Sequence, residues 1–209
     1  MRTVITTIEE LDKWMLENKR PVMAIDTETT SLKYLDLELT AITIATEIDS
    51  CYINMSKLAP SWVLCRTVDL HDVQWVMHRA VYDLQVFKKY GFTPRSIFCT
   101  MVGAQLCDCN RKSYSLDSLA KDWLGSNKTM KYKDAESFGI NSPEFIDYAI
   151  TDAELTFKLY GYEYPILKKA NQLYLIAAVE TPFLYVQRDM EINGVLLDKD
   201  RHNYFTKVV

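Results

Sequence analysis

A short apolar segment near the start of the chain ends abruptly on a carboxylate. Pro21 interrupts the pattern before it, and the apolar residues 22–25 then lead directly to Asp26. A run this short, apolar and ended by a charge is typical of a buried strand. Residues 40–46 alternate between polar and apolar, and another strand-like segment follows at 50–55. These two segments predict an antiparallel meander after the buried strand.

Helical patterns dominate the rest of the chain. Thr7, followed three residues later by Glu10, predicts a capped helix at the N-terminal end. Further on, the sequence predicts a strand over residues 73–77 and helices over 82–90, 115–124 and from 142 to about 170. Strands followed by strands mixed with helices predict an α/β layered domain with a mixed sheet.

Composition limits the class of protein. The chain has 209 residues, 48% of them hydrophobic and 25% charged, which favours one globular domain and excludes a disordered or fibrous protein. No segment approaches the roughly 20 apolar residues needed to span a bilayer, and the N-terminus lacks a signal-peptide pattern. We therefore expect a soluble intracellular protein without a membrane partner. The net charge of −4 neither indicates nor excludes nucleic-acid binding, because local Lys and Arg residues can still meet phosphates on an acidic protein.

The five cysteines indicate reduced thiols. Their number is odd, their spacing is scattered, and no export signal precedes them. Cys107 and Cys109 form a pair that could bind a soft metal, but no second Cys/His pair with zinc-finger spacing accompanies them. We expect structural roles for these cysteines.

Two carboxylates stand two residues apart at the end of the buried strand. In an extended chain Asp26 and Glu28 point to the same side, where they repel each other unless a cation lies between them. Oxygen-rich sites of this kind suit Mg²⁺ or Mn²⁺. Taken alone, the pair also fits an ordinary polar turn after a strand.

Three more polar residues lie on predicted helices. Tyr148 and Asp152 are four residues apart, hence on one helix face, and such a pair often serves solubility or packing. Asp83 is near the start of another helix, where a carboxylate complements the helix dipole. Each of these signals is modest by itself.

Their order along the chain resembles that of the DEDD exonucleases. Residues 24–32, which contain Asp-Thr-Glu, resemble the first motif of that family, residues 78–83 the second, and residues 148–152 the third in its tyrosine form. The match is closest to the proofreading domain of family A (polymerase-I-like) DNA polymerases. Residues 115–124 and 180–198 are similar to further segments of that domain and of its connection to the polymerase. The resemblance covers nearly the whole chain and implies a ribonuclease-H-like mixed sheet flanked by helices.

The resemblance implies a 3′→5′ exonuclease that uses two divalent ions, Mg²⁺ or Mn²⁺, and releases nucleoside 5′-monophosphates. Asp26 is then expected to bridge the two ions. Glu28 and Asp152 complete the site of the ion that activates water, and Asp83 holds the second ion. The Tyr148 hydroxyl is expected to orient the attacking water, because a phenol with a pKa of about 10 is a poor base at neutral pH.

The resemblance also implies contacts with a single-stranded DNA 3′ end. Leu32 is expected as a wedge between the last two bases and Tyr132 as a stacking residue, with core packing as the alternative for both. Thr27 is expected to contact the substrate. Arg79 replaces the asparagine usual in the second motif, and it either clamps the scissile phosphate or crowds the site. Basic residues that either track the DNA backbone or form a solvated face are Arg111, Lys112, Lys128, Lys131 and Lys133.

The implied domain organisation is an exonuclease domain over residues 1–170 and a helical tail over 171–209, with a turn at Asn193-Gly194. The tail resembles the start of a family A polymerase domain, so a polymerase domain in cis or in trans is an expected partner. The chain ends before such a domain could form, which suggests an excised or naturally split piece of a polymerase. Met1 without a preceding 5′-nuclease domain suggests a phage enzyme.

Three other interpretations remain at this stage. A ribonuclease-D-like RNA exonuclease shares the acidic motifs, although the polymerase-like tail argues against it. A non-catalytic module that only binds DNA or a partner has no need for all four carboxylates. The third interpretation is a soluble α/β domain in which the motifs occur by chance.

Overall fold

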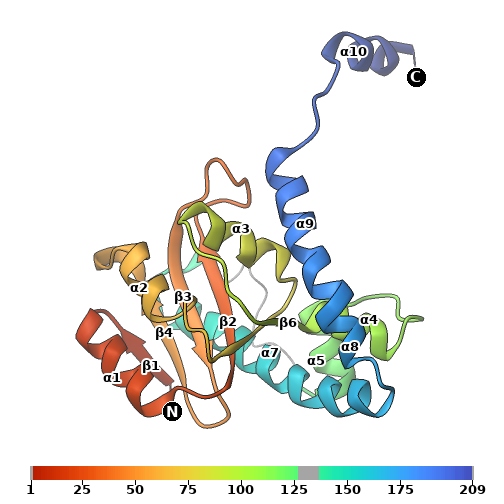
Figure 1. Ribbon diagram of the computed structural model, residues 1–209. Coiled ribbons are helices and arrows are strands. Elements are labelled where there is room, and N and C mark those ends of the chain that lie inside the picture. Colours follow the sequence, from red (N-terminus) through yellow and green to blue (C-terminus); the bar gives the residue numbers. More distant parts are fainter. Residues whose placement is uncertain (1, 127–136, 209) are drawn as a thin grey trace.

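The computed structural model describes residues 2–126 and 137–208, with a six-stranded mixed sheet at the centre (Figure 1). The spatial order of the strands is β1-β4-β3-β2-β5-β6. The pairs β2–β3 and β3–β4 are antiparallel, and β1–β4, β2–β5 and β5–β6 are parallel. The strands are β1 Arg2–Ile5, β2 Val22–Thr29, β3 Leu39–Ala45, β4 Ser50–Asn54, β5 Gln74–Met77 and β6 Ile97–Cys99. The expected mixed α/β architecture and its antiparallel meander are confirmed.

Helices cover both faces of the sheet (Figure 1). The longest, α7, has 27 residues, begins after the Ser142 cap with Pro143 in its first turn, and ends as expected near residue 170. The helical elements are α1 Ile8–Asn18, η1 Met55–Lys57, α2 Pro60–Arg66, α3 Val81–Lys89, α4 Thr100–Cys107, α5 Leu116–Leu124, α7 Pro143–Lys169, α8 Leu173–Leu175, η2 Ile176–Glu180, α9 Thr181–Asn193 and α10 Lys199–Val208. The turn expected at Asn193-Gly194 is present, with Gly194 at a φ of 65°.

The two faces of β2 bury different kinds of residue. Met23 and Ile25 belong to a large apolar cluster with residues of α1, α2 and α3. On the other face Ala24 packs against Ala153 of α7. Small side chains on this second face let α7 lie close to the sheet, which brings polar groups of the helix to the end of β2.

The structure corrects several boundaries. β2 does not end at Asp26 but continues to Thr29, because the polar Asp-Thr-Glu segment pairs with β3. The sequence did not predict β1, β6, α2 or α4. β1 and β6 have only four and three residues, too few for a periodic pattern to emerge. The capping box of α1 is present as expected: Thr7 Oγ1 accepts a hydrogen bond from the Glu10 amide, and the Glu10 carboxylate accepts one from the Thr7 amide.

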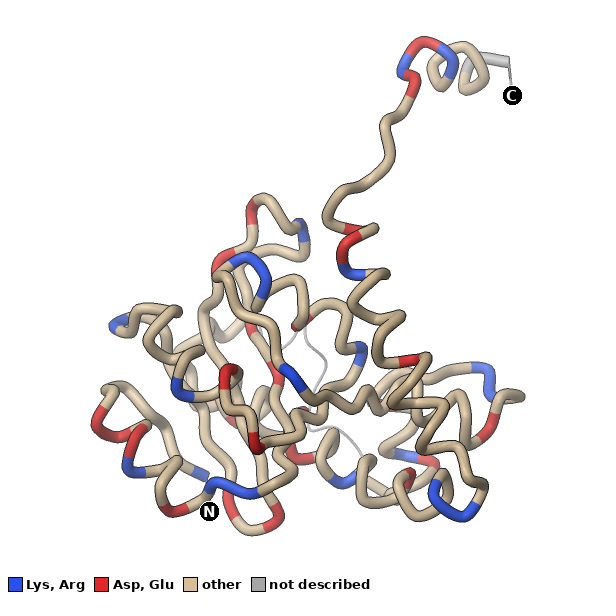
Figure 2. The backbone as a smooth tube through the Cα atoms, in the orientation of Figure 1, with Lys and Arg blue, Asp and Glu red and all other residues tan. Residues whose placement is uncertain are grey.

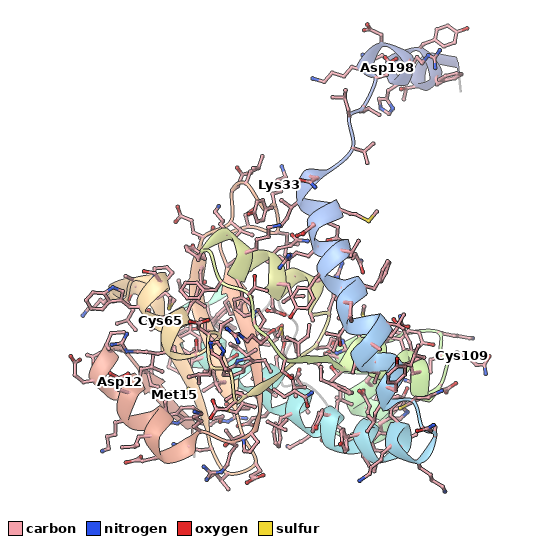
Figure 3. The ribbon with its side chains drawn as sticks, in the orientation of Figure 1. Asp12, Met15, Lys33, Cys65, Cys109 and Asp198 are labelled. Carbon is pink, nitrogen blue, oxygen red and sulfur yellow. The ribbon has the colours of Figure 1, made fainter. Side chains whose placement is uncertain are left out.

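The charged residues, the cysteines and the helices show the character that the composition predicted. Acidic and basic residues are interspersed along the whole backbone (Figure 2). All five cysteines lie in the described part of the chain and are free thiols, and Figure 3 shows Cys65 and Cys109 on separate parts of the fold. Across residues 2–126 and 137–208, none of the helices combines the length and the apolar character needed to cross a membrane.

A buried carboxylate lies between α7 and α4. Glu163 is fully buried, and a Cβ atom added to Gly103 of α4 would clash with its Oε2. Neither carboxylate oxygen has a hydrogen-bond partner among the described residues. Burial raises the pKa of Glu163 to about 9, so the side chain is protonated at neutral pH.

Glu163 predicts a pH-dependent stability. Its folded-state pKa is raised, so the folded chain binds the proton more tightly and loses stability as the pH rises from the unfolded pKa toward about 9. Between pH 6 and pH 8 this group is expected to remove roughly 3 kcal/mol from the free energy of unfolding. Urea unfolding at both pH values measures this loss. The loss should be absent in Glu163→Gln and should remain in the control variant Glu17→Gln, which changes an exposed residue. Equal pH dependence of wild type and Glu163→Gln would contradict the prediction.

Candidate active site

β2 presents two carboxylates on the face that α7 covers. Asp26 lies opposite Thr43 of β3, and Glu28 lies opposite Ala41. The pairing shifts by one residue just after Glu28, so the regular strand geometry ends there. Glu28 is buried and Asp26 is half-buried. The local fold therefore holds both side chains at the end of a paired strand, as their spacing predicted.

α7 brings Tyr148 and Asp152 to the same place. The two residues are one helical turn apart and both are buried. Together with Asp26 and Glu28 they line a cavity of about 410 Å³. Three carboxylates and one phenol from elements more than a hundred residues apart thus share one cavity.

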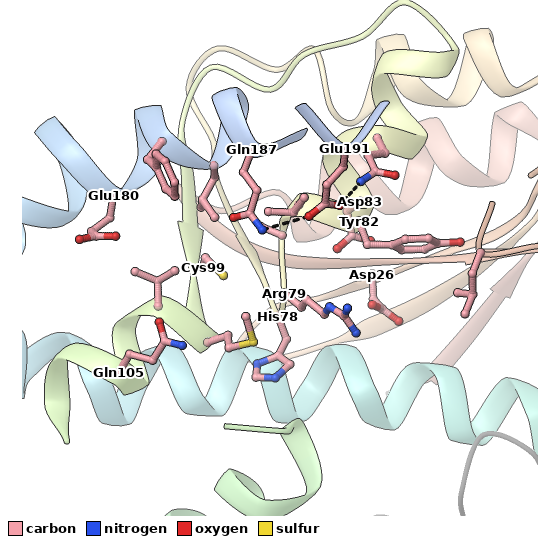
Figure 4. Close-up of a pocket in the computed structure, with 18 residues that line it drawn as sticks. Asp26, His78, Arg79, Tyr82, Asp83, Cys99, Gln105, Glu180, Gln187 and Glu191 are labelled. Carbon is pink, nitrogen blue, oxygen red and sulfur yellow. Dashed lines mark hydrogen bonds between the residues drawn. The ribbon is translucent and has the colours of Figure 1, made fainter. Parts of the chain in front are cut away.

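α3 adds the fourth carboxylate. Asp83 lies in the first turn of α3 and is buried, with its Oδ1 accepting a hydrogen bond of 2.7 Å from the Thr27 hydroxyl of β2. Burial raises the pKa of Asp83 well above its usual range, although the Thr27 hydrogen bonds partly oppose this shift. Asp83 and Asp26 line a second cavity of about 620 Å³ (Figure 4). Asp26 therefore lines both cavities, with Asp83 on one side and Glu28 and Asp152 on the other.

The Tyr148 phenol is held in its protonated form. Burial, followed by the charge of Asp152, a hydrogen bond with Asp152 and the charges of Glu28 and Asp26, raises the Tyr148 pKa above its ordinary value. A neutral hydroxyl beside carboxylates can donate a hydrogen bond but is a weak base. This environment fits an orienting group.

Arg79 has an unusual backbone conformation at the start of α3. Its φ is 59°, in the left-handed region that side chains other than glycine rarely adopt. It lines the larger cavity, and in Figure 4 its side chain extends toward Asp26. Such a conformation costs on the order of 1–3 kcal/mol and is concentrated at functional sites. No pattern in the amino-acid sequence indicated this strained conformation.

Leu32 lies on an exposed loop and does not pack in the core. It is 82% exposed and borders both cavities. The loop is anchored by two residues of α3 that the sequence did not single out: the Tyr82 hydroxyl donates to the Ser31 carbonyl, and Lys89 Nζ donates to three loop carbonyls. The position of Tyr82 directly before Asp83 could have suggested a role for Tyr82 near the site. Nothing in the sequence suggested that Lys89 anchors the loop.

Some expected contacts with DNA are unsupported. Tyr132 lies outside the described residues, as do Lys128, Lys131 and Lys133. Arg111 is already engaged within the fold, because it forms an ion pair with Asp122 at 2.5 Å and lies over the Trp123 ring at 5.0 Å. Arg111 is therefore a poor candidate for phosphate contacts.

The four carboxylates fit divalent ions by their chemistry. All their donor atoms are oxygens, which hard cations such as Mg²⁺ and Mn²⁺ prefer. Within the described ranges, no three His, Cys, Asp or Glu side chains already surround one point at which a metal could be held. The carboxylates are instead distributed around two adjoining cavities that meet at Asp26.

Comparison with known proteins finds relatives in sequence and solved structures of similar fold. DNA polymerase I of Borreliella burgdorferi is 31% identical over 213 residues, which cover 95% of this chain and 23% of that protein. The chain spans about a quarter of the length of the curated relatives it matches. Among solved structures, Brucella melitensis NrnC with bound Mg²⁺ superposes with a TM-score of 0.75 at 19% identity, covering 92% of this chain and 93% of that one. Escherichia coli RNase D, an exoribonuclease, gives 0.73 at 18% identity, covering 90% and 50%.

These likenesses define the fold and the family. The structural neighbours have the ribonuclease-H-like fold of the DEDD exonucleases, as the sequence predicted. A family model described as a 3′–5′ exonuclease of the DNA polymerase A type matches residues 2–164. Because that match covers most of the chain, the protein belongs to the DNA polymerase A 3′–5′ exonuclease family.

Proposed function

We propose that this protein is a metal-dependent 3′→5′ exonuclease that hydrolyses the 3′ end of single-stranded or frayed DNA. The products are nucleoside 5′-monophosphates, and the role is proofreading during DNA replication. The observation that carries the proposal is the position of Asp26, which lines both cavities between Asp83 on one side and Glu28 and Asp152 on the other.

Each carboxylate has a role in this proposal. Asp26 would contact two divalent ions, Glu28 and Asp152 would complete the site of one, and Asp83 that of the other. When bound, such ions lower the pKa of a water molecule and neutralise charge on the leaving oxygen. Thr27 positions Asp83 through hydrogen bonds from its hydroxyl and its backbone, and it lines the smaller cavity, where it would contact the terminal nucleotide.

Leu32 and Arg79 act on the substrate. Leu32 is exposed at the border of both cavities and separates the terminal base from its neighbour. Arg79 lies in the larger cavity on the side of Asp26 and contacts the scissile phosphate. A planar guanidinium suits phosphate oxygens, which favours the clamp over the crowding interpretation.

Tyr148→Phe tests the division of labour on α7. The hydroxyl orients water without binding metal, so its loss is expected to lower the rate roughly 30- to 1000-fold, or ~2–4 kcal/mol, and to leave metal affinity nearly unchanged. Asp152→Asn is the matched variant one turn along the helix, and it is expected to weaken metal binding as well. Single-turnover digestion titrated with Mn²⁺ measures both quantities. Identical Mn²⁺ dependence in the two variants, or a Tyr148→Phe rate within about twofold of wild type, would refute the assignment.

DNA is the proposed substrate because the curated relatives are DNA polymerases I. RNA is the second candidate, since RNase D, an exoribonuclease, has a similar fold. Digestion of DNA and RNA strands of identical sequence distinguishes them. The proposal predicts a higher kcat/KM for DNA, and a preference for RNA would replace it with an exoribonuclease.

A polymerase domain, in cis or in trans, is the proposed protein partner. The relatives extend well beyond the matched region, and the tail helix α9 carries exposed apolar residues at helical spacing: Val179 just before it, then Phe183, Val186 and Met190. In this proposal residues 1–170 form the exonuclease domain and residues 171–209 lead toward the polymerase.

A further inference from the structure

The loop between β2 and β3, residues 30–38, projects from the end of the sheet next to α3 (Figure 1). At its base the Thr30 amide donates to the Glu38 carbonyl at 3.0 Å, and Leu37 is fully buried in the main core cluster. Between these points the loop is open to solvent, and Leu32 is 82% exposed. The position of Leu32 therefore depends on the contacts that hold the middle of the loop.

α3 holds this loop on both sides of Leu32. On one side the Tyr82 hydroxyl, in the first turn of α3, donates to the Ser31 carbonyl at 3.1 Å. On the other side Lys89, the last residue of α3, donates from Nζ to three loop carbonyls. These carbonyls belong to Tyr34, Leu35 and Leu37, at 3.3, 3.0 and 2.7 Å. Because the same helix carries Asp83, both anchors fix Leu32 relative to the site.

The ammonium group of Lys89 directs its full donor capacity at the loop. An ammonium has three N–H donors and no acceptor, and three carbonyls surround this one. Hydrogen bonds from a charged donor are roughly twice as strong as those between neutral groups. Lys89→Met keeps a side chain of similar length but removes all three donors. In that variant we expect the loop to open locally, because few other contacts hold its exposed part.

A fixed Leu32 matters most when the 3′ end is paired. Leu32 borders both cavities, where the terminal base is proposed to part from its neighbour. Extruding a base from a duplex costs pairing and stacking energy, whereas the end of a single strand unstacks readily. A loop that is already ordered needs none of its interaction with DNA to order itself. The anchor should therefore contribute more on paired ends than on single strands.

We propose that Lys89 is a positioning residue, which fixes the Leu32 loop and thereby determines how well the exonuclease digests paired 3′ ends. This inference rests on the proposed function. Lys89 acts through Leu32, since its ammonium is bound by the loop backbone. The loss of Lys89 should consequently matter only while Leu32 is present.

A double-mutant cycle on two substrates tests this coupling. A 5′-labelled DNA strand is digested in Mg²⁺ under single-turnover conditions, either alone or paired with its complement. The proteins are wild type, Lys89→Met, Leu32→Ala and the double variant. The matched control is Lys88→Met, which removes the neighbouring lysine of the same helix, also half-buried, whose Nζ pairs with Asp189.

Lys89→Met is expected to lower the rate on the paired strand roughly tenfold, which corresponds to a loop that holds Leu32 correctly about a tenth of the time. On the single strand the rate should stay within about twofold of wild type, because little unstacking is needed there. In the Leu32→Ala background, Lys89→Met should cause no further loss, since two residues that act through one element are not additive. Lys88→Met should keep the wild-type ratio of the two rates.

Equal losses on both substrates, a further loss in the Leu32→Ala background, or a wild-type ratio in Lys89→Met would overturn the role of Lys89. Amide hydrogen exchange gives a measurement that does not depend on activity. In Lys89→Met, faster exchange should be confined to residues 30–38, and faster exchange throughout the fold, or none in the loop, would contradict the inference. Wild type that digests neither strand would refute the proposed function itself, whereas a failed cycle with active wild type refutes Lys89 alone.

Discussion

Asp26→Ala is expected to lower the rate of exonuclease digestion by several orders of magnitude. Asp26 is the one carboxylate of the four that lines both cavities, so its loss removes a ligand from both proposed ion sites. Removal of a single preorganised electrostatic contact already costs about 10²–10³-fold, which makes on the order of 10³-fold a lower bound. Single-turnover digestion of a single-stranded DNA in Mg²⁺ measures the loss.

The fold of Asp26→Ala is expected to survive. Repulsion between Asp26 and the neighbouring carboxylates is relieved, which offsets lost contacts. Thermal unfolding should therefore show a transition close to that of wild type. Asp200→Ala, which removes an exposed carboxylate on α10, is the matched control and should digest DNA at the wild-type rate. An Asp26→Ala variant that keeps a tenth of the wild-type rate would refute the assignment of Asp26.

Removal of divalent ions is expected to abolish activity. None of the side chains lining the smaller cavity is a strong base at neutral pH, because burial raises the pKa of both tyrosines there, Tyr82 and Tyr148, and the other titrating groups are carboxylates. Excess EDTA should stop digestion, and Mg²⁺ or Mn²⁺ added beyond the chelator should restore it. Full digestion by the protein in excess EDTA would exclude the proposed mechanism.

The sequence predicted the central part of the fold because its signals are local. The apolar run before Asp26, the Ser142-Pro143 start of α7 and the capping box at Thr7 depend on neighbouring residues alone. β1 and β6 depend instead on pairing with β4 and β5, so no local pattern announces them. The extension of β2 through Glu28 has the same cause, since pairing with β3 overrides the polar character of the segment.

The candidate site divides in a similar way. The order of the motifs predicted that the four carboxylates belong to one site. In the structure they line two cavities that adjoin at Asp26. The left-handed conformation of Arg79 and the three carbonyls bound by Lys89 arise from tertiary geometry. Contacts of α9 with α3 likewise join residues about a hundred positions apart, and spacing along the chain cannot reveal them.

The most direct test of the central proposal is the direction of digestion. A single-stranded DNA with a label on its 5′ end is incubated with the protein and Mg²⁺, and labelled products are separated by length over time. The proposal predicts a ladder that shortens one nucleotide at a time, unlabelled nucleoside 5′-monophosphates from the first time point, and neither with Asp26→Ala. Immediate release of the label as a mononucleotide, internal cleavage, or the same ladder with Asp26→Ala would contradict it.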